Sequence, residues 1–251
     1  MKYILILFFV FLFSFNVISC SSKDDDSSST STDSDGTTTD SCLSTSISSR
    51  QPARSSNDYA YGVATDSSGN VYVAGGTNGG LDGNTNAGNT DLFVVKYNSS
   101  GTKQWTRQLG SSSRDSANGV ATDSSGNVYV TGMTNGGLDG CKNAGIEDLF
   151  VVKYNSSGTK QWTNQLGSSS RDSADDVATD SSGNIYVTGT TYSELDGNTS
   201  AGKADLFVVK YNSSGTHQWT KQLGTDRYDE ARGVATDSSG NVYVTGYTEG
   251  G

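Results

Sequence analysis

Residues 62–73 read Gly-Val-Ala-Thr-Asp-Ser-Ser-Gly-Asn-Val-Tyr-Val, and the same stretch returns almost unchanged three more times. The four copies begin at residues 62, 119, 176 and 233, so they lie 57 residues apart each time. A fixed period of this length is typical of one supersecondary unit that stacks on copies of itself. The repeat therefore predicts the fold of most of the chain, although it names no ligand.

Each repeat is expected to form four short strands separated by turns that carry Gly. The segments that predict strands are rich in Val and Tyr or alternate in polarity, and no segment keeps a helical period of 3.6 residues. Asp-Ser-Ser-Gly and Asn-Ser-Ser-Gly place Gly where a turn needs a positive φ. Such a unit is typical of a four-stranded antiparallel β-propeller blade, so we expect an all-β fold. In the first repeat the strands are expected at residues 60–66, 71–75, 91–97 and 103–109.

The amino-acid sequence of the repeat resembles a known family. Residues 119–132 read Gly-Val-Ala-Thr-Asp-Ser-Ser-Gly-Asn-Val-Tyr-Val-Thr-Gly, and residues 148–163 read Asp-Leu-Phe-Val-Val-Lys-Tyr-Asn-Ser-Ser-Gly-Thr-Lys-Gln-Trp-Thr. Both segments resemble the bacterial β-propeller repeat family called SBBP and, more distantly, NHL-type repeats. The resemblance covers residues 58–251 and implies a propeller, often with seven blades. It implies no common activity, because one fold hosts many functions.

The repeat count predicts about three and a half blades. Shifting the chain by one period aligns Arg50-Gln51 with Arg107-Gln108, so residues 46–51 are interpreted as a stray fourth strand. Propellers use about four to eight blades. We therefore expect an incomplete or truncated ring within a repeat domain at residues 45–251. Its blades are expected at about 58–109, 115–166 and 172–223, with a half blade at 229–251.

The N-terminal segment predicts export and a lipid anchor. The apolar run at residues 4–15 is too short to span a bilayer, which favours a lipoprotein signal peptide at residues 1–19. Residues 17–20, Val-Ile-Ser-Cys, resemble a lipobox, which implies that Cys20 is diacylated and anchors the chain to a membrane. An ordinary secretory signal with a chance Cys is the alternative.

Residues 20–44 are expected to form a disordered tether of Ser, Thr and Asp, because residues 21–40 hold no aromatic or aliphatic side chain. Lys23 and the three Asp residues after it resemble the export tether of surface lipoproteins, and a generic spacer is the alternative. Ser21 after the lipidated Cys resembles the sorting signal for the bacterial outer membrane. The expected location is therefore the outer membrane, with exposure at the cell surface.

The net charge and the cysteine content limit which partners and which disulfides can be expected. The net charge is −10, so a basic groove for nucleic acid is not expected. Cys42 and Cys141 could form a disulfide in an exported protein, and two free thiols are the alternative.

The order of the strands places the loops after second and fourth strands on one face, which becomes the candidate binding face. It is expected to collect the Asp that begins each repeat, namely Asp58, Asp115, Asp172 and Asp229. On the same face, alternating oxygen-bearing residues in the first long loop predict a weak calcium site formed by Asp82, Asn84, Asn86 and Asp91. A loop held by Asx turns is the alternative, and no other cofactor is expected.

Catalysis finds little support in the sequence. No Ser/His/Asp set recurs, and no cluster of His suggests a metal site. The blades are nearly identical, whereas an active site needs residues unique to one blade. We therefore predict a membrane-anchored, surface-exposed scaffold or binding module for a protein or a glycan. The alternative is a carbohydrate-active hydrolase or lyase that uses carboxylates of the loop face.

Overall fold

The computed structural model describes residues 56–250. The signal peptide, Cys20, the tether, Cys42 and the strand expected at residues 46–51 lie outside the described residues, so the structure tests none of these predictions. Within the described residues no helix is long and apolar enough to cross a bilayer.

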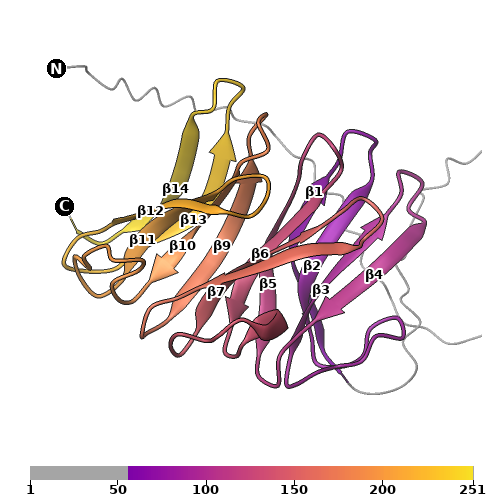
Figure 1. Ribbon diagram of the computed structural model, residues 1–251, viewed down its shortest axis with the longest axis horizontal. Coiled ribbons are helices and arrows are strands. Elements are labelled where there is room, and N and C mark those ends of the chain that lie inside the picture. The colour runs from indigo at the N-terminus through magenta and orange to yellow at the C-terminus, as the bar shows by residue number, and fades with distance from the viewer. Residues whose placement is uncertain (1–55, 251) are drawn as a thin grey trace, which may run out of the picture. The chain divides into compact units, whose positions relative to one another are not determined.

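The described chain is all β, apart from one turn of 3₁₀ helix, η1 (Leu138–Gly140), in a loop. It forms three four-stranded antiparallel sheets and one two-stranded sheet, which confirms the predicted fold class (Figure 1). The strands of each sheet pair in chain order, so every sheet is one blade. The first blade contains β1 (Asp58–Thr65), β2 (Val71–Thr77), β3 (Asp91–Tyr97) and β4 (Lys103–Leu109). The second contains β5 (Asp115–Thr122), β6 (Val128–Thr134), β7 (Asp148–Tyr154) and β8 (Lys160–Leu166). The third contains β9 (Asp172–Thr179), β10 (Ile185–Thr191), β11 (Asp205–Tyr211) and β12 (His217–Leu223), and β13 (Asp229–Thr236) with β14 (Val242–Thr248) forms the hairpin.

Strands β3 and β4 have the bounds that the sequence predicts, whereas β1 and β2 extend further toward the long loop. Their pairing continues until Asp58 lies opposite Thr77, beyond a β-bulge between Ala60 and Gly62. The extra residue of this bulge is Tyr61, and the second and fourth repeats have a bulge at the same place. A bulge re-aims the side chain it carries, which matters for the surface described below.

The turn between the first two strands forms as predicted from Asp66. Its Oδ1 accepts hydrogen bonds from the backbone of Ser68 at 2.9 Å and Asn70 at 3.0 Å, and its Oδ2 accepts one from the Tyr72 hydroxyl at 2.9 Å. Gly69 has a φ of 76°, a conformation that other residues rarely adopt. The same bonds recur in the other three repeats, so this turn is a property of the repeat.

Neighbouring blades stack through their first strands. The Thr122 hydroxyl donates to the Thr65 carbonyl of the preceding blade at 3.0 Å, and Thr179 and Thr236 repeat the bond one and two blades further on. The core lies between blades: Trp105 packs against Tyr72 of its own blade and Tyr154 of the next, with ring centroids 6.0 and 6.5 Å apart. Trp105 therefore fills the space between the first and second blades.

The described blades do not close into a ring. The first blade packs only against the second, and the hairpin β13–β14 packs only against the third (Figure 1). Three blades and a half blade thus form an incomplete propeller over residues 56–250, as expected.

Candidate ligand-binding surface

The long loops and the connections between blades lie together at one end of the strands, as the strand order predicts. In the connection from the first blade to the second, the backbone of Asp115 donates to the Thr90 carbonyl at 2.7 Å. The carbonyl of Arg114 accepts a bond from the backbone of Asn135, just beyond β6, at 2.9 Å. Equivalent bonds join the later repeats, so this end of the repeat domain is built from three segments per blade.

Three of the four aspartates that begin the repeats are buried, whereas the sequence led us to expect all four on an accessible face. Asp115, Asp172 and Asp229 are all buried. Asp172 accepts bonds from the Ser168 backbone at 2.6 Å, the Ser168 hydroxyl at 2.8 Å and the Thr191 hydroxyl at 2.5 Å. Burial raises the pKa of Asp172, and these bonds oppose that effect. The carboxylates hold the connection between blades against the end of the second strand.

Asp58 differs from the other three because it is exposed at the start of β1. The Thr77 hydroxyl donates to its carboxylate, as the equivalent Thr does in the next two blades. Asp58 therefore has the same internal partner, although it remains open to solvent.

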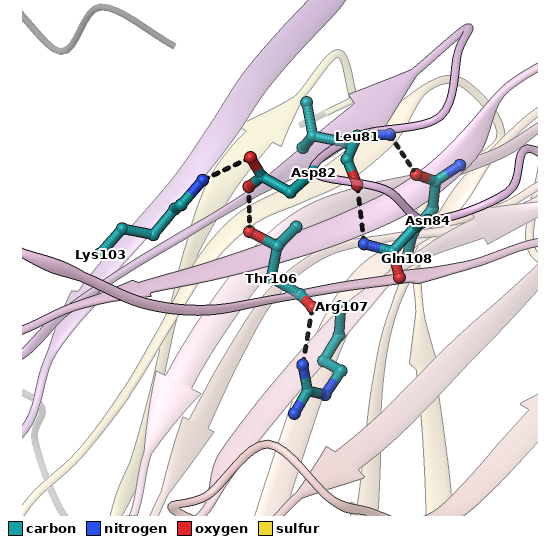
Figure 2. Close-up of polar contacts among 7 residues, drawn as sticks. All are labelled: Leu81, Asp82, Asn84, Lys103, Thr106, Arg107 and Gln108. Atoms are coloured by element: carbon teal, nitrogen blue, oxygen red, sulfur yellow. Dashed lines mark hydrogen bonds and ion pairs between the residues drawn. The ribbon is translucent and has the colours of Figure 1, made fainter. Parts of the chain in front are cut away.

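Two of the residues predicted to bind calcium, Asp82 and Asn84, each have hydrogen-bond partners of their own (Figure 2). The Asp82 carboxylate forms an ion pair with Lys103 and accepts a bond from the Thr106 hydroxyl on β4. Burial by itself raises the pKa of Asp82, but the bonds with Lys103 and Thr106 outweigh this effect and bring the pKa below its ordinary value. Asn84 donates to the Leu81 carbonyl at 2.7 Å.

The remaining two predicted ligands belong to another part of the loop. Asn86 Oδ1 accepts from the backbone of Gly88 at 2.8 Å, which is an Asx turn. Asp91 Oδ2 accepts from the backbone of Ala87 at 2.8 Å and from the Gln108 amide at 2.9 Å. Each of the four side chains thus has a hydrogen-bond partner within the first repeat, as in a loop held by its own hydrogen bonds, and the calcium site stays a prediction. No group of three or more His, Cys, Asp or Glu within residues 56–250 is arranged to hold a metal ion.

Cys141 is half-buried in the second long loop, and it has no disulfide partner within residues 56–250. Burial and the nearby Asp139 carboxylate raise the pKa of this thiol, so little of it is thiolate at neutral pH. Because Cys42 lies outside the described residues, the disulfide between the two stays a prediction.

Many of the differences between the repeats gather in one place, although others lie elsewhere, such as Arg107, Asn164 and Lys221 at one position of the fourth strands. The first strands read Asp-Tyr-Ala-Tyr, Asp-Ser-Ala-Asn, Asp-Ser-Ala-Asp and Asp-Glu-Ala-Arg before they become similar again. Similar variation occurs in three other segments: the last residues of the second strands, the ends of the long loops and the connections between blades. We call this surface the inner loop face. It comprises Tyr59, Tyr61, Gly76, Asn78, Thr90 and Arg114 with their equivalents in the later repeats.

Exposed tyrosines are concentrated on the inner loop face. Five of them are 36–56% exposed: Tyr59, Tyr61, Tyr192, Tyr228 and Tyr247. Tyr59 and Tyr61 lie on β1 with parallel rings, at an interplanar angle of 10° and a centroid distance of 6.2 Å. Tyr and Arg are enriched where proteins bind partners, because they combine apolar area with hydrogen bonding.

The inner loop face contains two pockets. One has a volume of about 140 Å³ and is lined by Tyr59, Tyr61, Gly76, Asn78, Thr90, Arg114 and Ser116. The other has a volume of about 220 Å³ and is lined by Glu147, Arg171, Ser173, Asp175, Thr190, Tyr192, Glu230 and Arg232. The linings correspond through the repeat, since Tyr59 is equivalent to Ser173 and Asn78 to Tyr192. Neither lining contains an aliphatic side chain.

The larger pocket carries both charges. Arg232 forms an ion pair with Glu230. Burial, together with the Glu230 and Asp176 carboxylates, raises the pKa of Asp175 to about 6, against the opposing attraction of Arg232. Burial also raises the pKa of Glu147, which Arg171 opposes. Perturbed carboxylates in a pocket are candidates for functional groups.

This surface was not predicted from the sequence, although the sequence contains a signal for it. The bulged position carries Tyr61, Asn118, Asp175 and Arg232 in four repeats that are otherwise almost the same. Residues that vary between the repeats, rather than the recurring Asp, mark the pockets.

Comparison with known proteins agrees with the geometry. Stacked four-stranded antiparallel blades at a fixed period define a β-propeller repeat protein. Four segments, residues 49–82, 104–139, 161–196 and 218–251, match the family described as SBBP, Beta-propeller repeat, and together they cover more than half of the chain. The chain therefore belongs to the SBBP family, as its resemblance predicted.

Two curated relatives are similar over a larger segment. Regulatory protein FlaEY of Caulobacter vibrioides is 29% identical over 208 residues, which are 74% of this chain and 22% of the relative. An uncharacterized WD repeat-containing protein of Acanthamoeba polyphaga mimivirus is 28% identical over 185 residues, which are 58% of this chain and 13% of the relative. The chain thus spans less than a quarter of the length of either relative. One solved structure, a protein of unknown function from Bacteroides caccae, is similar with a TM-score of 0.43 and 11% identity, over 77% of this chain and 55% of that one.

Proposed function

We propose that this chain is a non-catalytic binding module whose ligand site is the inner loop face, and that a lipid on Cys20 presents it at the bacterial outer membrane. One observation carries the binding role. In a chain whose repeats are nearly identical, many of the residues that differ lie around two pockets on one face, and they include five exposed tyrosines. Neutral drift would scatter such differences over the whole exposed surface, whereas a ligand site gathers them.

The alternative of a carbohydrate-active enzyme is less well supported. An enzyme of this kind would use the carboxylates at the starts of the repeats as catalytic groups. However, Asp115 and Asp172 are buried and hydrogen-bonded inside the fold. Of the carboxylates in the larger pocket, Glu230 is paired with Arg232. The relatives carry names of repeat or regulatory proteins rather than of enzymes.

A variant built from the chain's own repeats tests the binding role. Four inner residues are replaced by the Ser and Asn that the second blade carries as Ser116 and Asn118, so each change is already compatible with the repeat. The substitutions of this homogenised chain are Tyr59→Ser, Tyr61→Asn, Glu230→Ser and Arg232→Asn. We expect the wild-type chain to bind at least one ligand on arrays of glycans and peptides, the homogenised chain to lose that binding, and neither to cleave a panel of glycosidase and lyase substrates.

Two results would contradict the proposal. Turnover of a substrate by the wild-type chain would identify an enzyme. Equal binding by the wild-type and homogenised chains would place the ligand elsewhere.

The lipid anchor is tested separately. In a bacterial host, wild-type chain is expected to incorporate labelled palmitate and to fractionate with the outer membrane, whereas Cys20→Ala is expected to remain unlabelled, because the thiol is the acylated atom. Cys141→Ala is the matched control and should be labelled like wild type. Label on Cys20→Ala would remove the anchor from the account.

A further inference from the structure

We propose that the ligand of the inner loop face is an extended, uncharged polysaccharide. This inference rests on the proposed function and specifies its ligand. Three features of the surface carry it: the chemistry of the pocket linings, the size and recurrence of the pockets, and the charge of the chain.

The pocket linings provide flat aromatic rings and hydrogen-bonding groups, with no aliphatic side chain between them. In the smaller pocket, Tyr59 and Tyr61 form a platform of parallel rings beside the Asn78 amide and the Arg114 guanidinium. A sugar ring has an apolar face of C–H groups and a rim of hydroxyls, and such a platform matches both. An apolar helix or strand would need aliphatic contacts that these pockets do not offer.

The larger pocket repeats this chemistry with other residues. Tyr192 supplies the ring, and Ser173, Thr190 and Asp175 supply hydroxyl and carboxylate groups. The Asp175 carboxylate has no hydrogen-bond partner within the described chain, and its pKa of about 6 means that it is mostly ionised at neutral pH. A carboxylate accepts hydrogen bonds only, so it fits the hydroxyls of a sugar.

The pocket volumes indicate that the ligand extends beyond one pocket. Volumes of about 140 and 220 Å³ lie below the range of about 300–1,000 Å³ that encloses a whole small ligand. Each pocket therefore takes one portion of a ligand, and the repeat places a second pocket on the same face. A polymer of similar units matches a row of similar pockets, and it gains affinity when it occupies more than one.

Charge decides between classes of polysaccharide. The chain has a net charge of −10, which repels polyanions such as sulfated or uronic-acid chains. In the larger pocket positive and negative side chains alternate, with Arg171 and Arg232 beside Glu147, Asp175 and Glu230. The Arg side chains can donate hydrogen bonds to sugar hydroxyls and the carboxylates can accept hydrogen bonds from them. Because the two charges are mixed, the pocket favours neither a cationic nor an anionic ligand.

The test is calorimetric titration of the full-length chain with neutral glucan and mannan oligosaccharides of increasing length. A sulfated polysaccharide and basic and acidic peptides are titrated in parallel. We expect affinity for one neutral series to rise with length, and the double variant Tyr59→Ser, Tyr61→Asn to weaken the longest oligomer by about tenfold or more, since each ring contributes about 0.5–1.5 kcal/mol beyond its buried area. Tyr243→Ser is the matched control, because Tyr243 is exposed at the turn end of β14 and should leave affinity unchanged.

The outcomes separate this inference from the proposed function. A peptide that binds, and loses binding in the double variant, would overturn the polysaccharide and leave the binding module standing. A preference for the sulfated chain, or affinity independent of oligomer length, would also overturn the inference. If wild-type chain binds none of these probes, both the inference and the proposed function fail.

Discussion

Asp172→Ala is expected to lower the free energy of unfolding by about 3 kcal/mol. The wild-type carboxylate accepts three hydrogen bonds in a buried site, from the backbone and hydroxyl of Ser168 and from the Thr191 hydroxyl. Bonds to a charged group contribute about 1.5–3 kcal/mol each, and a buried donor left without a partner costs about 1–3 kcal/mol. The raised pKa of Asp172 shows that its burial offsets part of this gain.

Urea denaturation of the purified chain measures this effect. Asp82→Ala is the matched control. Like Asp172, Asp82 accepts a hydrogen bond from a Thr hydroxyl, but it is exposed and is paired with Lys103. Exposed ion pairs contribute about 0–1 kcal/mol to stability. If Asp172→Ala were no more destabilising than Asp82→Ala, the buried aspartates would not hold the blades, and their assignment to a ligand site would return.

Trp162→Ala is expected to lower the free energy of unfolding by about 3–4 kcal/mol, because it leaves a cavity between the second and third blades. The partly buried ring packs against Tyr129 with a centroid distance of 6.1 Å, and it lies against a core cluster that contains Tyr211 of the next blade. It also lies against Gly215, where an added Cβ would come within 2.8 Å of the ring. Removing a large buried aromatic side chain typically costs about 3–5 kcal/mol.

Trp219 provides the matched comparison, because it has the same place in the third blade. It contacts Tyr186 of its own blade at 6.2 Å, but the two-stranded hairpin after it supplies no third strand within the described residues. Trp219→Ala is therefore expected to cost about 1–2 kcal/mol, less than a fully packed ring. Equal losses for the two variants would show that the Trp stabilises its own blade and does not join two blades.

Much of the fold could be predicted from the sequence because its determinants are local. The turn at Asp66 is closed by residues within six positions of it, and the Gly with positive φ is visible in the repeat itself. Strands β3 and β4 have alternating or uniformly apolar patterns bounded by such turns. The bulge at Tyr61 was missed, since it depends on how β1 pairs with β2 and leaves no mark in composition.

The candidate site was harder to predict because it depends on side-chain direction and on packing between blades. An Asp at the start of a strand is equally compatible with facing solvent and with capping the connection before it. Only the structure shows that Asp115 and Asp172 turn inward. The pockets combine residues from different repeats, such as Tyr59 with Ser116 and Glu147 with Glu230, so no local pattern could reveal them.

The central claim is that the residues of the inner loop face differ between repeats for recognition and not for packing. A thermal melt of the homogenised chain tests this most directly, since it needs no ligand. Ser116 and Asn118 already fit the repeat, and Asn118 donates to the Ala174 carbonyl of the next blade at 2.9 Å, so Asn in place of Tyr61 can form the equivalent bond. We predict a Tm within about 3 °C of the wild-type value, where 1 kcal/mol corresponds to about 2–4 °C for a domain of this size. A fall of about 10 °C or more would show that these residues are needed to hold the blades together, and would contradict the account.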